Sequence, residues 1–332
     1  MIESIQFKNF KALRDTTLPL GPCTILVGPN GSGKTTVLQA LEAIRGAASP
    51  SFQQIATADT REDHDTAVEI RLNFAPPYDN TACVGSWQLG TGIAKRFVGV
   101  ASKDEQSLDR AVHGIRVFSF DATAIAEPVV LRTKMQLGSN GGGLAGVLDR
   151  LRDHSPERFE ALNEELGRWL PEFDRILFDI VNTDRRAFLL RTRDTHHEIP
   201  AADLSQGTLI ALTILTLAYL PDPPSLIGLE EPDRGIHPYL LRHVQDAIYR
   251  LTNPESCGET REPVQVIATT HSPYFLDLFK DFPEEIVVAN KVGADVQFQR
   301  LTDQPHFQEI LADTALSDAW FAGVLGGVPS SS

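Results

Sequence analysis

The stretch of sequence that decides the fold is Gly28-Pro29-Asn30-Gly31-Ser32-Gly33-Lys34-Thr35, and Thr36 follows it directly. It fits the phosphate-binding pattern G-x-x-x-x-G-K-[ST] at every fixed position. The apolar run at 24–27 leads in as a buried strand, and residues 36–44 lead out with the apolar spacing of a helix. A glycine turn before a helix is the alternative interpretation, but it does not explain why a lysine and a hydroxyl stand in register with the glycines.

Each residue type in this stretch suits a nucleotide site. Glycines at 28, 31 and 33 permit backbone angles closed to other residues, so successive N–H groups can converge on phosphate oxygens at the positive end of the helix. Lys34 adds a charge for the β- and γ-phosphates, and Thr35 can offer its hydroxyl to Mg²⁺. The loop from Gly28 to Thr36 therefore predicts a bound nucleotide together with its metal ion.

Composition places the chain among ordinary globular proteins. Hydrophobic residues make up 42% and charged residues 22%, and no apolar run approaches the roughly 20 residues of a membrane span, so we expect no membrane insertion. The first residues enter an alternating strand pattern rather than an apolar leader, so a secretory signal is not expected. The cysteines Cys23, Cys83 and Cys257 form neither a metal pattern nor a disulfide framework, which favours a cytoplasmic location.

The charge balance bears on nucleic-acid binding. Thirty Lys and Arg against 44 Asp and Glu give a net charge of −14, which argues against broad, non-specific attraction to DNA or RNA. A local basic groove is still compatible with this balance, so DNA is kept as an alternative partner. An acidic surface that maintains solubility is the simpler explanation.

Several further elements can be placed from periodicity. Strands at 68–74, 84–89, 95–100 and 114–120 predict an antiparallel sheet inserted after the phosphate-loop helix. The glycine-rich run 138–143 predicts a flexible joint, because a second phosphate cradle would need a lysine, a hydroxyl and a preceding strand. A helix at 209–220 is apolar nearly all round and should be buried. Other helices are expected at 144–151, 155–170, 239–251 and 307–311, and other strands at 176–181, 187–191, 225–229, 264–269, 285–289 and 296–301.

Two carboxylates follow one of these apolar strands. Glu230 would hold Mg²⁺ directly or through water, and Glu231 would polarise the water that attacks the γ-phosphate. Acidic residues at strand ends are common, so this pair carries weight only together with the phosphate loop. His271 ends the next buried strand, where it either donates a hydrogen bond to the γ-phosphate or merely caps the strand end. His237 either shapes the loop after the carboxylates or crosses a subunit interface.

Taken together, the motifs GPNGSGKTT, LSQGT, LIGLEEP, GIHP and TTHSP resemble those of the ABC-type ATPase heads of the SMC and RecF group. Within that group the chain most resembles the small stand-alone AAA ATPases related to the overcoming-lysogenization-defect (OLD) family. The opening run 5–11 and the tail 320–329 are similar to the ends of such heads. The resemblance implies an α/β fold of the P-loop ABC-ATPase head type, with a RecA-like core, an inserted antiparallel β subdomain and a short helical lobe.

The resemblance also implies a division of the chain. We expect a single ATPase domain over 1–332. Its subregions would be a nucleotide-binding core at 1–45 and 176–305, an antiparallel β insert at 66–135, a helical lobe at 138–172 and a C-terminal tail at 306–332.

Roles for particular residues follow from the same resemblance. The segment 204–208 corresponds to the signature motif, in which Ser205, Gln206 and Gly207 cap the γ-phosphate of ATP bound by a second protomer. Two ATP molecules would then be sandwiched in a head-to-tail homodimer. Glu231 corresponds to the catalytic glutamate and His271 to the switch histidine, so the resemblance implies hydrolysis of ATP to ADP and phosphate. The loop 233–237 corresponds to the segment that crosses between protomers.

The chain departs from the family pattern in three ways. Glu230 stands where aspartate is usual, the glutamine that senses the γ-phosphate has no clear position, and neither a long coiled coil nor a C-terminal nuclease domain is expected. The favoured function is an ATP-driven dimerisation switch in DNA metabolism or anti-phage defence, with a separately encoded effector such as a nuclease. The alternatives are the ATPase subunit of an ABC membrane transporter and a nucleotide-binding scaffold with little turnover.

Overall fold

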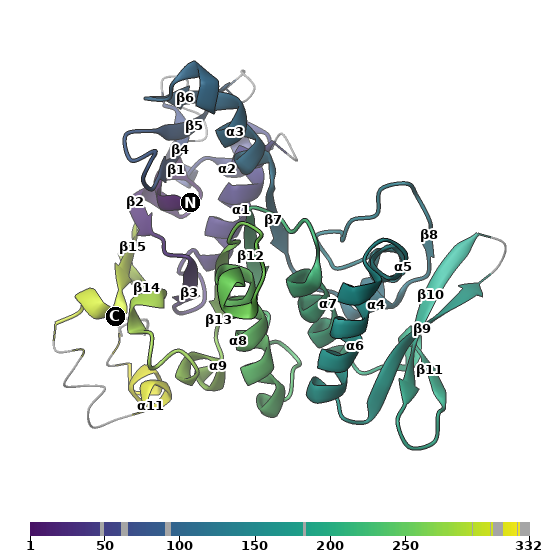
Figure 1. Ribbon diagram of the computed structural model, residues 1–332. Helices are drawn as coiled ribbons and strands as arrows, with labels where there is room; N and C mark the ends of the chain where they lie inside the picture. Colours follow the sequence, from purple (N-terminus) through teal and green to yellow (C-terminus); the bar gives the residue numbers. More distant parts are fainter. Residues whose placement is uncertain are drawn as a thin grey trace. The chain divides into compact units, whose positions relative to one another are not determined.

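The computed structural model describes residues 1–46, 50–60, 66–89, 94–181, 184–293, 295–305, 307, 315–323 and 325 (Figure 1). The chain forms two compact units. Unit 1 comprises 1–117, 224–230 and 264–332, and unit 2 comprises 118–223 and 231–263. The chain passes from unit 1 to unit 2 twice, after residue 117 and again after Glu230. The second crossing therefore separates Glu230 from Glu231, the two consecutive carboxylates of the sequence motif.

Unit 1 contains an antiparallel five-stranded sheet in the order β2-β1-β4-β5-β6. Its strands are β1 (Ile2–Phe10), β2 (Leu13–Pro19), β4 (Val68–Phe74), β5 (Ala82–Trp87) and β6 (Ala94–Val98). The alternating apolar residues of β4 are buried, as the two-residue period predicts. The sequence grouped β1 with the nucleotide-binding core, but β1 pairs with β4 in register, for example Phe7 with Ile70, a long-range pairing that local patterns do not reveal.

A six-stranded sheet, in the order β15-β14-β3-β13-β12-β7, forms the centre of the nucleotide-binding region. Its strands are β3 (Cys23–Val27), β7 (Ile115–Phe118), β12 (Leu226–Glu230), β13 (Gln265–Thr270), β14 (Ile286–Val292) and β15 (Asp295–Arg300). The strands β14, β3, β13 and β12 run parallel, and β3 and β13 are buried along their whole length. Buried parallel strands read as continuous apolar runs, and this is how the sequence revealed them.

The sequence placed two features of this region wrongly. The strand expected at 114–120 is β7, at the edge of the six-stranded sheet rather than in the antiparallel insert, because a short apolar strand fits either sheet. No helix was expected between the strands at 95–100 and 114–120, where α3 (Ser102–His113) lies. Only Leu108 and Val112 are buried in α3, so its polar surface conceals the helical period.

Other elements of unit 1 are short apart from α1 (Lys34–Arg45). They are α2 (Phe52–Ile55), α9 (Pro273–Asp277) and α11 (Leu316–Phe321). Neither α2 nor α11 was predicted from the sequence. The helix expected at 307–311 and the Gly/Ser-rich end of the tail lie almost wholly outside the described residues.

Buried Gln265 fastens β1 to the central sheet. Its side-chain oxygen accepts from the Ile2 N–H at 3.0 Å, and its amide nitrogen donates to the carbonyl oxygens of Ile2 at 2.7 Å and Gly21 at 2.9 Å. The side chain is 2% exposed, so these bonds satisfy a group whose burial is otherwise costly. The two sheets of unit 1 therefore share one polar anchor.

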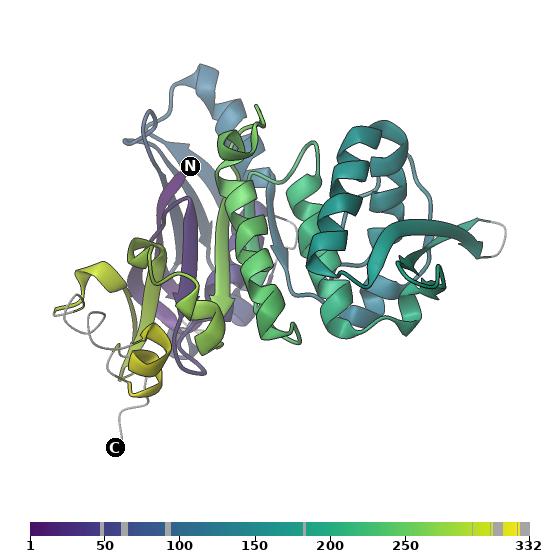
Figure 2. The same cartoon turned by 60° about the horizontal axis from the view of Figure 1, so that its bottom comes forward.

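Unit 2 combines helices with a four-stranded sheet (Figures 1 and 2). The helices are α4 (Ala122–Ala126), α5 (Leu144–His154), α6 (Pro156–Trp169), α7 (Gln206–Tyr219) and α8 (Pro238–Thr252). The strands are β8 (Val129–Val130), β9 (Phe173–Val181), β10 (Arg185–Thr192) and β11 (Glu198–Pro200). In α7 every residue from Gly207 to Tyr219 is buried, which confirms the expectation of an apolar helix without a solvent face.

The glycine-rich run 138–143 is held by hydrogen bonds. The N–H of Ser119 donates to the carbonyl oxygen of Ser139 at 2.8 Å, and that of Asp121 donates to Asn140 at 2.9 Å. The backbone of Gly138 donates to Gly142 at 2.8 Å. The run expected to be a flexible joint is therefore a hydrogen-bonded loop in front of α5.

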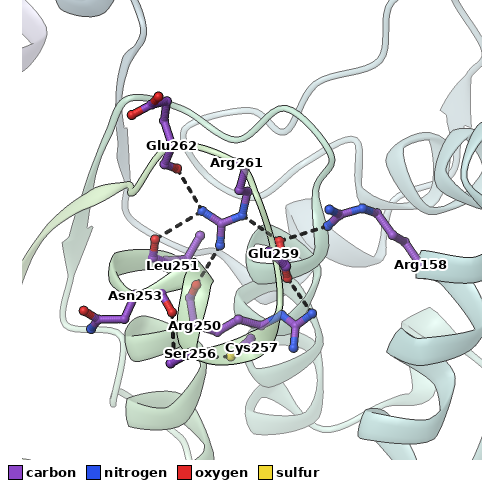
Figure 3. Close-up of polar contacts among 9 residues, drawn as sticks. All are labelled: Arg158, Arg250, Leu251, Asn253, Ser256, Cys257, Glu259, Arg261 and Glu262. Atoms are coloured by element: carbon purple, nitrogen blue, oxygen red, sulfur yellow. Dashed lines mark hydrogen bonds and ion pairs between the residues drawn. The ribbon is translucent and has the colours of Figure 1, made fainter.

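An ion-pair cluster stabilises the segment after α8, within unit 2 (Figure 3). The side chain of Glu259 is 8% exposed and contacts the guanidinium groups of Arg250 at 2.5 Å, Arg261 at 2.8 Å and Arg158 at 3.3 Å. Arg261 also donates to the carbonyl oxygens of Arg250 at 2.7 Å and Leu251 at 3.2 Å. The cluster thus caps the last turn of α8 and joins it to α6 through Arg158.

Replacing Glu259 with glutamine should lower the free energy of unfolding by about 3 kcal/mol, because three guanidinium groups would lose their shared, poorly hydrated carboxylate. Urea unfolding at neutral pH measures the loss. The exposed Glu262 of the same segment offers a matched control, Glu262→Gln, which should change stability little. Equal stability of the Glu259→Gln and wild-type proteins would contradict the assignment.

The same cluster predicts a dependence on pH. Burial alone would raise the pKa of Glu259, but Arg250, Arg158 and Arg261 outweigh burial and the pKa is lowered. A lowered folded-state pKa means that the stabilisation is complete above the unfolded value of about 4.3 and is lost as pH falls through the folded value. The difference in unfolding free energy between wild type and Glu259→Gln should therefore shrink in acid.

Candidate nucleotide site

The phosphate loop connects β3 to α1 in a backbone conformation that requires glycine. Gly31 and Gly33 have φ angles of 77° and 85°, in the left-handed region, and Gly33 is the N-cap of α1. A Cβ at Gly28 would lie 2.7 Å from the carbonyl oxygen of Ala289 on β14, so no side chain fits there. A Cβ at Gly31 would meet nothing within 4 Å, so the loop is open on that side. Asn30, Gly31 and Thr35 are exposed at this opening.

Lys34 is buried at the start of α1, with 7% of the residue exposed. Its ammonium group donates to the carbonyl oxygens of Gly28 at 2.8 Å and Pro29 at 3.0 Å. The hydroxyl of Ser32 is also buried and has no hydrogen-bond partner among the described residues. Both side chains place hydrogen-bond donors within the loop, which is the chemistry that phosphate oxygens require.

The structure brings together the two residues expected to hold the metal. The hydroxyl of Thr35 donates to a carboxylate oxygen of Glu230 at 2.6 Å, although 195 positions separate the two residues. Glu230 pairs with Thr269 across β12 and β13, and Thr269 pairs with Leu26 across β13 and β3, so the three strand ends are level. A hydroxyl and a carboxylate are hard oxygen donors of the kind that Mg²⁺ prefers when phosphates supply further oxygens. The arrangement fits that ion.

His271 lies beside the phosphate loop in the strand register. It follows Thr270, which pairs with Val27, the last residue before Gly28. Its strand β13 stands between β3 and β12, so His271 emerges between the strand that precedes the loop and the strand that ends in Glu230. Ser272 then begins α9, where its hydroxyl accepts from the Phe275 N–H. The strand-end position expected from the sequence is correct.

The signature segment lies in unit 2, at the start of α7. The hydroxyl of Ser205 accepts from the Thr208 N–H at 3.2 Å and so caps the helix. Ser205 and Gln206 are exposed, whereas Gly207 is buried. A Cβ at Gly207 would lie 2.6 Å from the carbonyl oxygen of Gly235, a distance that real side chains do not reach. The signature segment therefore packs directly on the loop that follows the carboxylates.

That loop begins at Glu231, which has a left-handed backbone with φ 45°. Such a conformation is uncommon for a residue with a side chain and often marks a functional position. The carbonyl of Glu231 accepts from the Arg234 N–H at 3.0 Å, and Arg234 donates in turn to the carbonyl oxygen of Phe120 at 3.3 Å. His237 ends the loop as the N-cap of α8, where its ring nitrogen accepts from the Tyr239 N–H at 3.2 Å.

Sequence reasoning missed one residue near Glu230. Glu42 lies on α1, two turns after Thr35, and is half-buried. Burial raises the pKa of Glu42 and the charge of Glu230 raises it further, while Arg45 opposes both effects. A glutamate on the partly polar face of an amphipathic helix gives no sequence signal, because such positions are usually solvated.

Comparison with known families places the chain among ATPases. A family model described as "AAA domain, putative AbiEii toxin, Type IV TA system" matches residues 102–277, more than half of the chain. The chain belongs to this AAA domain family. A second model, "AAA ATPase domain", matches residues 1–140 of this AAA ATPase. The two matches together span the phosphate loop, Glu230 and His271, and ATP hydrolysis is therefore the activity of the domain.

Individual relatives of this AAA ATPase agree with its family. A protein of Thermus scotoductus described as an OLD nuclease is 24% identical over 84% of this chain and 60% of its own length. The chain thus spans about 60% of that relative. A stretch of 71 residues, 21% of this chain, is 39% identical to 20% of the sulfate/thiosulfate import ATP-binding protein CysA 1 of Agrobacterium fabrum.

Solved structures show the fold. The SMC head bound to the C-winged helix domain of ScpA matches with TM-score 0.63 and 14% identity, over 90% of this chain and 96% of that one. The SMC head domain of Thermotoga maritima matches with TM-score 0.53 and 15% identity, over 90% and 98%. These findings confirm the expected α/β fold of an ATPase head like those of SMC proteins, and the Thermus scotoductus relative confirms the similarity to OLD proteins.

The contact between Gly207 and Gly235 predicts the effect of one methyl group. In Gly207→Ala, either α7 or the loop beginning at Glu231 has to shift. We expect kcat for ATP to fall by about tenfold or more, since small misplacements of catalytic groups are costly. Nucleotide affinity should change little, because the phosphate loop does not include this contact.

Amide hydrogen exchange provides the structural readout. Exchange should accelerate at Arg234 and Ile236, whose N–H groups close the loop through the carbonyls of Glu231 and Asp233. Ala202→Ser, at an exposed position before the signature segment, serves as the control. Unchanged exchange and kcat in Gly207→Ala would show that the contact does not position Glu231.

Proposed function

We propose that this AAA ATPase binds ATP between two copies of the chain, arranged head to tail, and that hydrolysis releases the copies. The observation that carries the proposal is the 2.6 Å hydrogen bond between Thr35 and Glu230, which joins a complete phosphate loop to a strand-end carboxylate. The exposed Ser205 and Gln206 at the start of α7 supply the second half. The positive end of a buried, fourteen-residue helix suits an anion such as the γ-phosphate of the partner's ATP.

The roles of the residues follow from their chemistry. Lys34 and the N–H groups of 31–35 would bind the β- and γ-phosphates of ATP, and Thr35 and Glu230 would hold Mg²⁺. Bound Mg²⁺ supplies positive charge for the developing negative charge on the phosphate oxygens. Glu231 would orient and polarise the attacking water, and His271 would donate a hydrogen bond to the γ-phosphate.

The biological role that we propose is a switch in DNA metabolism or anti-phage defence. The relative described as an OLD nuclease supports this role, and the chain matches only part of it. We propose that a separately encoded effector, such as a nuclease, responds to the ATP state, that DNA is a candidate partner and that the protein acts in the cytoplasm. All three cysteines are free, as in a reducing compartment. Among the described residues, no helix combines the length and the apolar character needed to cross a bilayer.

The transporter alternative rests on the 71-residue similarity to CysA 1. That similarity covers only 21% of the chain and 20% of the transporter protein, so it gives this alternative weak support. Co-purification with an integral membrane protein would favour this alternative, and stimulation of ATPase activity by DNA or by a water-soluble partner would count against it.

Glu231→Gln tests the assigned role of the carboxylate. The variant should bind ATP and form dimers, while kcat falls by about two orders of magnitude or more because the attacking water loses its base. Sedimentation with and without ATP measures the dimer, and phosphate release measures turnover. Lys34→Ala, which should bind ATP poorly, is the control that stays monomeric. A monomeric Glu231→Gln protein with wild-type turnover would refute the proposal.

A mixing experiment tests whether the site is shared between two chains. Lys34→Ala removes the phosphate-loop cation, and Ser205→Arg blocks the capping surface, so each variant alone should hydrolyse ATP poorly. In a mixture, the Ser205→Arg chain can bind ATP and the Lys34→Ala chain can cap it, so ATPase activity should exceed the sum of the separate proteins. No gain on mixing, with both variants folded by circular dichroism, would contradict a site shared between chains.

A further inference from the structure

Several aliphatic side chains are exposed at one end of the four-stranded sheet in unit 2. Val130 is 44% exposed, Leu131 42%, Ile180 61% and Val181 37%. All five consecutive residues from Val130 to Lys134 are exposed. Scattered exposed aliphatic residues need no explanation, but Val130 and Val181 both neighbour Arg185 in the strand register and so lie together on one face, as the residues of a binding surface do.

Unpaired cations surround these aliphatic side chains. Arg132, Lys134, Arg150 and Arg185 are exposed, and none of them forms an ion pair with any of the described residues. Neighbouring arginines of the same unit differ, since Arg152 and Arg186 both pair with Asp149. An acidic protein of net charge −14 therefore carries a local group of cations whose counter-charges are not supplied by the fold.

The strand register places charge and aliphatic surface on one face. Arg185 pairs with Val130 on one side and with Val181 on the other, so the three side chains lie in a row across β8, β10 and β9. Arg150 on α5 donates to the carbonyl oxygen of Thr133, which holds the segment after β8 against the helix. We name the residues 129–134, with Arg150, Val181 and Arg185, the β8 edge.

The two edges of this sheet differ in their protection. On the edge strand β9, the N–H of Ile176 donates to the side-chain oxygen of Asn163 at 2.8 Å, and that of Ile180 donates to Asp179 at 2.7 Å. Side-chain caps of this kind prevent another strand from pairing. β8 ends the sheet on the opposite side, pairs with β10 through only two residues, and has no further strand beside it among the described residues.

We propose that the β8 edge binds an extended, acidic segment of a partner protein, which adds to the sheet as a strand. Strand addition obtains affinity from backbone hydrogen bonds and specificity from alternate side chains. Here the aliphatic residues would contact apolar side chains of the segment, and Arg132, Lys134 and Arg185 would contact its carboxylates. A second copy of the chain docked through the same surface would place like charges face to face. Nucleic acid offers no apolar partner for the exposed valines. The net charge of −14 opposes binding to an anionic membrane.

The test uses the full chain and a fluorescein-labelled peptide of alternating glutamate and valine, followed by fluorescence anisotropy. The triple variant Arg132→Glu, Lys134→Glu, Arg185→Glu should bind the peptide at least about tenfold more weakly than wild type. The control is a second triple variant with Lys103→Glu, Lys280→Glu and Lys291→Glu, which changes the net charge by the same amount at exposed positions of unit 1. It should bind the peptide as tightly as wild type. Hydrogen exchange with bound peptide should slow at the amides of β8 and of Leu131 beside it, whereas the Arg132 N–H already donates to the Met135 sulfur.

Each other outcome decides against the proposal. No binding to wild type, equal loss in the two triple variants, or equal binding of a peptide in which lysine replaces glutamate would overturn it. Duplex DNA or phosphatidylglycerol vesicles could instead bind more tightly than the peptide and lose that binding in the first triple variant. This result would reassign the β8 edge to that class of ligand. Circular dichroism and basal ATPase activity confirm that each variant is folded.

Discussion

The parallel register of β3, β13 and β12 is the constraint on which the candidate site depends. Because Leu26, Thr269 and Glu230 lie level with one another, the chain leaves all three strands at the same edge of the sheet. In open sheets of this kind, ligands bind beyond the carboxyl ends of the strands. A shift of one residue in any of these pairings would turn Glu230 to the opposite face of the sheet and separate it from Thr35.

A buried positive charge imposes the second requirement. The ammonium group of Lys34 is largely removed from water, so it needs acceptors, and the carbonyl oxygens of Gly28 and Pro29 provide them. A phosphate oxygen would compete for the same N–H donors with a full negative charge instead of a dipole. The loop is thereby kept folded around its cation, and glycine at 28 is the residue that lets β14 pack against the loop.

The sequence identifies what is local or what lies at the end of a buried strand. The phosphate loop is contiguous, and Glu230 and His271 each follow an apolar run, so their places could be predicted. The pairing of β1 with β4 and the edge position of β7 could not be predicted, because the sequence of a short strand does not indicate which strand it pairs with. Three other features could not be predicted either. The approach of Gly207 to Gly235 and the arginines around Glu259 depend on contacts between residues distant in sequence. Glu231 has a left-handed backbone, which a residue with a side chain does not favour.

The caps on β9 set a limit on assembly. A sheet with two open edges can accept a strand on one side and offer a template on the other, and repeated addition then produces a filament. Asn163 and Asp179 occupy two of the outward N–H groups of β9, those of Ile176 and Ile180, so pairing on that side is opposed. Repeated addition through both sides of this sheet is therefore opposed by two side-chain oxygens, which favours a finite complex over a filament.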